Sequence, residues 1–387
     1  MAGIYIHIPI CATRCIYCDF YSTTLRGRGS ELVEALTKEM AERRTFILEP
    51  VRTIYLGGGT PSQLGSQNIH DILKALSQHF DLSQCEEVTM EANPEDIASG
   101  LWETGRQGLL PGEELEVSVN RVSMGVQSMV DAELRLLHRR HDSQRVREAV
   151  KLLREKGIRN LSLDLMYGLP TQTIESWEYS IDQVLALRPE HISAYNLMVE
   201  EGTALYERVE RGELTPCDDE TCLAMAELLR KKLQAAGYEQ YEISNYAQPG
   251  YYSRHNSAYW TQTPYLGLGP GAHSYDGRNR RTWNAPDLIA YLAGKRTEED
   301  ELLSETDLYN ERVMLGLRTR KGIPVNELRN RSLLLKNTNL EPTMTSLLER
   351  GLIRLKEEDT PEGAQKYLCL TSAGLALADE VMRELMI

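Results

Sequence analysis

The chain has 387 residues, 41% of them hydrophobic, and a formal net charge of −14. This length favours two or three domains, each able to bury a core. The acidic balance argues against a nucleic-acid partner and against binding to an anionic membrane surface. No apolar run approaches the ~20 residues that span a bilayer, and the first residues lack a signal-peptide pattern, so we expect a cytoplasmic protein without a transmembrane segment.

Hydrophobic patterns predict six strands that alternate with helices over the first 200 residues. Strands connected by helices run parallel, and their crossovers are right-handed. The pattern therefore predicts an α/β fold, a partial (β/α)6 barrel over residues 1–235. The expected strands, the second of which runs into a glycine loop, lie at 4–8, 53–62, 86–96, 121–128, 161–170 and 191–200.

The remaining segments depart from this alternation. Residues 105–116 are expected to be an insertion, and residues 236–300, rich in Tyr, Trp, Gly and Pro, an irregular connecting region. Residues 301–387 follow a helix, strand, turn, strand, helix order, which predicts a winged-helix-like α+β domain. Eight acidic residues outnumber five basic ones between Leu347 and Ile387, so this domain is expected to pack or dock rather than bind DNA.

Three of the seven cysteines, Cys11, Cys15 and Cys18, follow the first strand within eight residues. Bunched thiols in a reducing compartment more often hold a metal or cluster than a disulfide. A closed zinc site needs four ligands, and no further Cys or His follows at a suitable distance. Three thiolates can hold three irons of a [4Fe–4S] cluster and leave the fourth iron open. Zinc and incidental thiols are the alternatives.

Other polar or glycine-rich positions lie where the later strands end. Gly57, Gly58 and Gly59 end the second strand, and Glu91, Gln127 and Asp164 lie at the ends of the third, fourth and fifth. In parallel barrels, chemistry takes place at the carboxyl ends of the strands. Taken singly, each position also fits a tight turn or a surface acid. Their shared location at one end of the barrel indicates a site.

The spacing CxxxCxxC, followed by GGGTP, resembles the signature of radical S-adenosylmethionine (SAM) proteins. That resemblance implies that the open iron binds SAM. It also implies that Gly57, Gly58, Gly59 and Thr60 contact the methionine amino group and that Glu91 accepts hydrogen bonds from the ribose. The resemblance further places Gln127, Arg139 and Asp164 in the SAM pocket and Tyr5 over the cluster. A buried Arg139–Asp164 ion pair and an outward-facing Tyr5 are the structural alternatives.

Longer segments, among them IYIHIPICATRCIYCDFYS, DLMYGLP, RHNSAYW and GLGPGAHSY, resemble the group that contains oxygen-independent coproporphyrinogen III oxidase and HemW-type haem chaperones. Three features separate the two. The oxidase motif continues with a fourth cysteine, where this chain has Phe20, and the oxidase has an N-terminal extension, where this chain has only ten residues before Cys11. The segment HNSAYW matches the HNxxYW motif of the chaperones. All three favour the chaperones.

The resemblance thus implies a haem chaperone. It would bind haem through His255, Tyr259 and Trp260 and pass it to apo haem proteins such as respiratory enzymes. A homodimer is also expected, Arg254 is a candidate partner of a propionate, and His273 is the next candidate ligand. The motif alone would also fit a loop whose histidine and aromatics pack a core. The enzymatic alternatives are the oxidase, in which a 5′-deoxyadenosyl radical from SAM starts propionate decarboxylation, or another radical SAM enzyme acting on a tetrapyrrole.

Overall fold

The six predicted strands form and pair in parallel in chain order, from β1 to β6. The computed structural model describes residues 2–25, 27–100, 117–360 and 363–387, so the predicted insertion at 105–116 lies outside the described residues. The sheet does not close, which confirms the partial barrel. The strands are β1 (Ala2–Ile8), β2 (Val51–Gly58), β3 (Glu87–Ala92), β4 (Arg121–Gln127), β5 (Asn160–Tyr167) and β6 (His191–Asn196).

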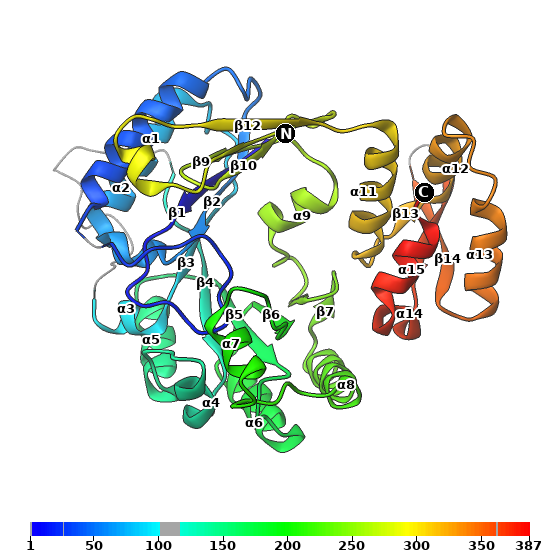
Figure 1. The fold of residues 1–387 in the computed structure, drawn as a ribbon, viewed down its shortest axis with the longest axis horizontal. Coiled ribbons are helices and arrows are strands. Elements are labelled where there is room, and N and C mark those ends of the chain that lie inside the picture. The colour runs from blue at the N-terminus through cyan, green and yellow to red at the C-terminus, as the bar shows by residue number, and fades with distance from the viewer. Residues whose placement is uncertain (1, 26, 101–116, 361–362) are drawn as a thin grey trace.

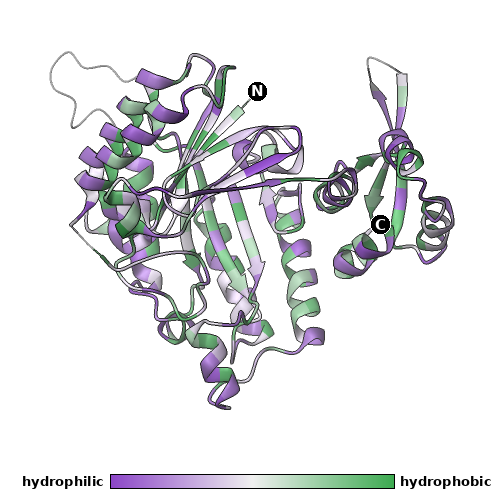
Figure 2. Ribbon diagram, turned by 45° about the horizontal axis from the view of Figure 1, so that its top comes forward, coloured by the Kyte–Doolittle hydropathy of each residue, from purple (hydrophilic) through white to green (hydrophobic). Residues whose placement is uncertain are grey.

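Helices cover the outer face of this sheet (Figure 1). Ile4, Ile6 and Ile8 of β1 are fully buried and belong to the core that the helices complete. Since side chains alternate along a strand, Tyr5 and His7 face the opposite, concave side. Figure 2 shows hydrophobic residues concentrated in the central strands. The helices are α1 (Gly29–Arg43), η1 (Pro61–Leu64), α2 (Gly65–His79), α3 (Pro94–Ala98), α4 (Asp131–Leu136), α5 (Ser143–Glu155), α6 (Ile174–Ala186), α7 (Ala204–Glu210) and α8 (Asp219–Ala235).

The segment expected to be an irregular connecting region, 236–300, instead extends the sheet at both edges. On one side β8 pairs with β6, and on the other β9 pairs with β1. These strands are two to five residues long and separated by glycine and proline, so they leave no alternating pattern long enough to detect. They are β7 (Glu239–Gln240), β8 (Asn245–Ala247), β9 (Tyr265–Leu268), β10 (His273–Tyr275), β11 (Arg280–Asn284) and β12 (Glu298–Leu302).

A buried ion pair in α1 fixes the added strands. Arg43 and Glu39 lie 3.2 Å apart. Arg43 also donates to the Gly267 carbonyl, and Glu39 accepts from the backbone N–H of Gly269. Both side chains are buried and have several partners, which offsets the cost of removing the charges from water. The network thereby holds β9 against α1 and beside β1.

The C-terminal part has its own hydrophobic core and a three-stranded sheet ordered β13-β15-β14, as expected for a winged-helix-like unit. Figure 1 shows α9 (Arg254–Trp260) between the barrel sheet and this part. None of the helices in the described ranges is long and apolar enough to cross a membrane. The remaining elements are α10 (Leu288–Leu292), α11 (Glu305–Leu317), β13 (Ile323–Pro324), α12 (Val325–Leu334), α13 (Leu340–Glu349), β14 (Ile353–Thr360), β15 (Gly363–Leu370), α14 (Ser372–Ala376) and α15 (Ala378–Leu385).

Candidate functional site

The three cysteines of the sequence motif lie on the loop between β1 and α1, at the carboxyl end of the barrel strands. Cys11 is buried, and Cys15 and Cys18 are half-buried. Burial raises the pKa of the Cys11 thiol, and burial together with the neighbouring thiols raises the pKa of Cys18 to about 11. Thiols crowded in this way ionise at neutral pH only beside positive charge, which iron would supply. Within the part of the chain that is described, no three His, Cys, Asp or Glu side chains are already arranged around a metal-sized space.

A chain of hydrogen bonds connects two of these sulfurs through other loops. Thr60 Oγ1 donates to Cys11 Sγ at 3.5 Å and accepts from Asn93 Nδ2 at 3.2 Å. Arg139 donates both to Asn93 Oδ1 at 2.6 Å and to Cys15 Sγ at 3.4 Å. Donors aimed at sulfur stabilise its thiolate form, so the arrangement suits ligation of a cluster. Sequence reasoning missed Asn93, although it follows β3 just as the predicted residues follow their strands.

The glycine loop after β2 contacts the predicted ribose acceptor. The backbone N–H of Gly58, whose φ is +106°, donates to Glu91 Oε2 at 3.0 Å. A Cβ on Gly59 would lie 2.7 Å from the Ile8 carbonyl oxygen, so only glycine allows this close approach of the loop to β1. Burial raises the pKa of Glu91 to about 7, although its hydrogen bonds to Tyr55 and Gly58 oppose the shift.

The other predicted SAM-pocket residues lie on the neighbouring strands. Asp164 accepts from the hydroxyls of Ser123 and Ser162, each at 3.0 Å, and burial raises its pKa. Arg139 has different partners, so the structural alternative of an Arg139–Asp164 ion pair does not explain these two side chains. Gln127 ends β4 with a φ of +66°, a strained conformation for a residue other than glycine.

Tyr5 points into the concave side of the sheet and not outward. Its hydroxyl donates to His7 Nδ1 at 2.9 Å, because His7 Nε2 donates in turn to the Tyr21 carbonyl at 3.0 Å. Tyr21 belongs to the cysteine loop, three residues after Cys18. The pair thus fastens the loop to β1 beside the cysteines.

His255 of the HNxxYW motif lies inside the barrel, below the glycine loop, and is 2% exposed. Its Nδ1 is hydrogen-bonded to Thr53 Oγ1 at 2.9 Å and its Nε2 to the Tyr259 hydroxyl at 3.0 Å. Burial, with the nearby guanidinium of Arg121, lowers its pKa to about 3. The ring is therefore neutral and has both nitrogens engaged.

A continuous set of contacts joins this histidine to the predicted SAM pocket. The Tyr55 hydroxyl donates to Glu91 Oε1 at 2.8 Å. The Tyr55 ring stacks on His255, with 5.1 Å between ring centroids. Tyr55 lies in the middle of β2, where no sequence pattern marked it as functional.

Replacing Gly3 by alanine is expected to disturb this packing. A Cβ at position 3 would lie 2.9 Å from Thr53 Oγ1 and 3.3 Å from the His255 ring. Overpacking of this kind lowers the free energy of unfolding by about 1–3 kcal/mol, which urea denaturation would measure. In a Thr53→Ala background the same change should cost less, because the nearest atom is gone. An equal cost in both backgrounds would contradict the assignment of the clash.

Trp260 does not join His255 and Tyr259, because it lies on another face of α9. It lines a cavity of about 540 Å³ with Tyr241, Tyr252 and Tyr367. The guanidinium of Arg318 lies 5.1 Å from the centre of its ring. Arg254, the candidate partner of a propionate, is exposed and paired with Glu86 at 2.6 Å.

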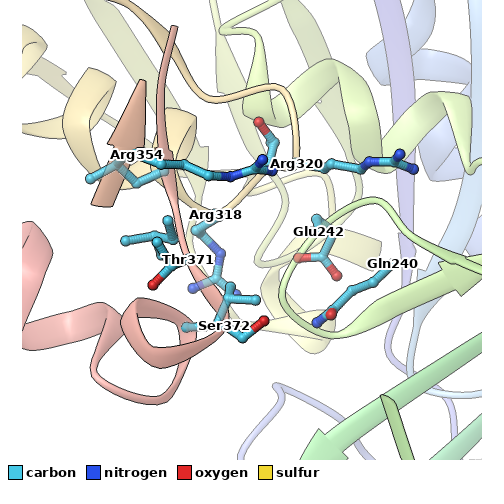
Figure 3. A pocket seen from close by; sticks show the side chains of 11 residues that line it. Gln240, Glu242, Arg318, Arg320, Arg354, Thr371 and Ser372 are labelled. Carbon is cyan, nitrogen blue, oxygen red and sulfur yellow. The ribbon is translucent and has the colours of Figure 1, made fainter. Parts of the chain in front are cut away.

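Arg318 also lines a second cavity, of about 390 Å³, between the barrel and the C-terminal part. In Figure 3, Arg318, Glu242 and Ser372 face a shared space, with Arg320 and Arg354 at its edge. One wall of this cavity forms where the segment around Ile243 pairs with the segment around Arg318. The N–H of Ile243 donates to the Arg318 carbonyl at 3.0 Å. Glu242 is 2% exposed, and its Oε2 has no partner among the described residues.

Comparison with known proteins identifies the family. The model of the Radical SAM superfamily matches residues 5–184, and that of the HemN C-terminal domain matches residues 303–377. The chain is 35% identical to the "Heme chaperone HemW" of Mycobacterium tuberculosis H37Rv, over 99% of this chain and 94% of that one. It is also 35% identical to the protein of the same name from Bacillus subtilis, over 98% of each chain.

Among solved structures, the coproporphyrinogen III oxidase (HemN) of Escherichia coli aligns with a TM-score of 0.79 and 22% identity, over 100% of this chain and 90% of that one. At this identity the likeness shows a shared fold. The cysteine loop, the polar groups at the ends of the strands and the near full-length likeness to curated relatives agree with one another. The chain belongs to the HemW family of radical SAM proteins.

Proposed function

We propose that the protein is a haem chaperone, which binds haem as cargo and passes it to apo haem proteins, respiratory enzymes among them. The observation that carries this proposal is the 35% identity, over 99% of the chain, to a relative named as a heme chaperone. Phe20 supports it, because it stands where the resemblance places a fourth cysteine in the oxidase. No feature of the described residues favours the oxidase in return.

The residues present fit a [4Fe–4S] cluster and SAM. Cys11, Cys15 and Cys18 would hold three irons, and Gly57, Gly58, Gly59, Thr60, Glu91, Gln127, Arg139 and Asp164 would surround SAM on the open iron, with Tyr5 beside them. When bound, cluster and SAM supply one-electron chemistry. In this proposal they support dimerisation or haem delivery, in a cytoplasmic homodimer. Glu91 would orient SAM by accepting hydrogen bonds from the ribose hydroxyls, and Asp164 would line the pocket.

The predicted haem contacts through His255, Tyr259 and Trp260 remain predictions. The structure adds a condition to them. For His255 to reach iron, its ring must give up the hydrogen bonds to Thr53 and Tyr259 and leave its stack with Tyr55.

An anaerobic haem titration of the cluster-reconstituted protein, followed in the Soret band, tests the proposal. We expect binding to saturate at about one haem per chain. On mixing with apomyoglobin, that haem should be transferred. Binding that does not saturate, or haem that is never released, would contradict the chaperone function. Decarboxylation of coproporphyrinogen in the presence of SAM and a reductant would replace it with the enzymatic alternative.

A further inference from the structure

We propose that the haem iron is ligated by His273, in an aromatic cavity beside the cysteine loop, and that His255 serves to position the wall of that cavity. This inference rests on the proposed haem-binding function and deepens it by assigning the site.

The eight histidines differ in exposure and in whether a ring nitrogen is available to ligate iron. Four of them are buried and have both ring nitrogens engaged, namely His7, His141, His191 and His255. His70 and His79 are half-buried on α2, and the two exposed histidines are His138 and His273. The ring nitrogens of His273 make no hydrogen bond to any described residue, so an iron could approach without breaking one. Partial burial and the nearby Arg281 lower the pKa of His273, which favours the neutral imidazole that ligates metals.

His273 lines a cavity of about 540 Å³, within the range of small-molecule and cofactor sites. Most of the lining is aromatic. Trp283 stacks on His273, with ring centroids 5.6 Å apart and planes inclined by 18°. Tyr259 packs edge-on against Tyr265 at 4.7 Å, and both of these rings line the cavity, as does Tyr5. Flat aromatic walls suit the faces of a porphyrin, and an imidazole on one wall suits its iron.

Phe20 is the second observation that points to a ligand. It lies on the cysteine loop at the cavity, and 65% of its side chain is exposed, an unusual exposure for phenylalanine. A planar apolar ligand in the cavity would cover it. The same loop contributes Tyr21, so the cavity adjoins the cysteines.

The fold fixes His273 in this place. A Cβ on Gly267 would lie 2.0 Å from the His273 carbonyl oxygen, so glycine is required where β9 approaches β10. Tyr259, which also lines the cavity, is hydrogen-bonded through its hydroxyl to His255 Nε2 at 3.0 Å. The HNxxYW motif thereby contributes Tyr259 to the cavity lining. Its histidine does not line the cavity but positions Tyr259 through the hydrogen bond to its hydroxyl.

The rival location is the cavity around Trp260. It also has aromatic walls, and basic side chains of Arg320 and Lys321 that could meet propionates. No histidine is among the described residues that line it. It could hold the plane of haem but would leave the iron without an imidazole.

The test compares His273→Ala with His255→Ala and with His138→Ala, the matched exposed histidine that borders a small cavity beside Cys15. Haem is titrated into each cluster-reconstituted protein, and both affinity and Soret position are recorded. We expect His273→Ala to bind haem at least about tenfold more weakly, with a shifted Soret band that added imidazole returns to its original position. His255→Ala should keep the original band and lose affinity only a few-fold, and His138→Ala should match the parent protein.

The outcomes separate the two proposals. If the parent protein fails to bind haem saturably, the proposed function itself falls, and the assignment of His273 with it. If the parent protein binds haem and His273→Ala retains its affinity and its Soret band, only the assignment falls. If the original Soret band is lost in His255→Ala and kept in His273→Ala, the iron ligand is His255 of the motif and not His273. Because His273 is exposed, its replacement is not expected to affect folding, which circular dichroism would check.

Discussion

A Cys15→Ala variant is expected to hold less than one iron per chain after anaerobic reconstitution, against about four in the parent protein. With Cys15 gone, only Cys11 and Cys18 of the loop remain, and two thiolates leave two irons of a cubane without protein ligands. Iron and sulfide analysis, together with the absorbance of the cluster, would measure the loss. Cys217→Ala is the matched control, because Cys217 is also half-buried but lies in the segment between α7 and α8.

A milder effect on the cluster is expected when Asn93 is replaced. Asn93→Ala keeps all three cysteines but removes the link between Thr60 and Arg139. We expect the variant to assemble a cluster and to lose it several-fold faster to a chelator, since outer hydrogen bonds usually change metal affinity by about 10–100-fold. Full iron content in Cys15→Ala, or a cluster in Asn93→Ala as durable as in the parent protein, would contradict these roles.

The location of the site could be predicted because parallel strands bring their carboxyl ends to one edge. Once six strands were recognised, Glu91, Gln127 and Asp164 had to lie near the cysteine loop, whatever the details of packing. Their partners could not be predicted in the same way. The contact of Tyr55 with both Glu91 and His255 depends on strand register and on α9, which comes some 200 residues later in the chain.

The region from 236 to 300 shows why a motif match does not give its geometry. The letters HNxxYW suggest three residues that act together. On a helix, positions 255 and 259 share a face, whereas position 260 is rotated by about 100° from 259. His255 and Tyr259 accordingly meet in the barrel, and Trp260 packs beneath Arg318 on the other side. Sequence patterns place residues on an element, and only the packing of that element decides what each one faces.

SAM binding is expected to weaken about tenfold between about pH 8 and about pH 6, because Glu91 must be ionised to accept two ribose hydroxyls. Burial raises the pKa of Glu91 to about 7, above its ordinary range. The carboxylate is therefore mostly charged at pH 8 and mostly neutral at pH 6, and each further unit below the pKa reduces the charged fraction tenfold. Equilibrium dialysis at a series of pH values would measure the affinity.

The Glu91→Gln variant tests whether Glu91, and not another titrating group nearby, causes the pH dependence of SAM affinity. Its amide cannot ionise, so SAM affinity should be low at pH 8 and should change little down to pH 6. Cluster absorbance, recorded in parallel, would show whether the iron site stays intact over the same range. If the variant retained the pH dependence of the parent protein, the proton would have to act elsewhere. Asp164 would then be the next candidate, because burial raises its pKa as well and it lies two strands away in the same sheet.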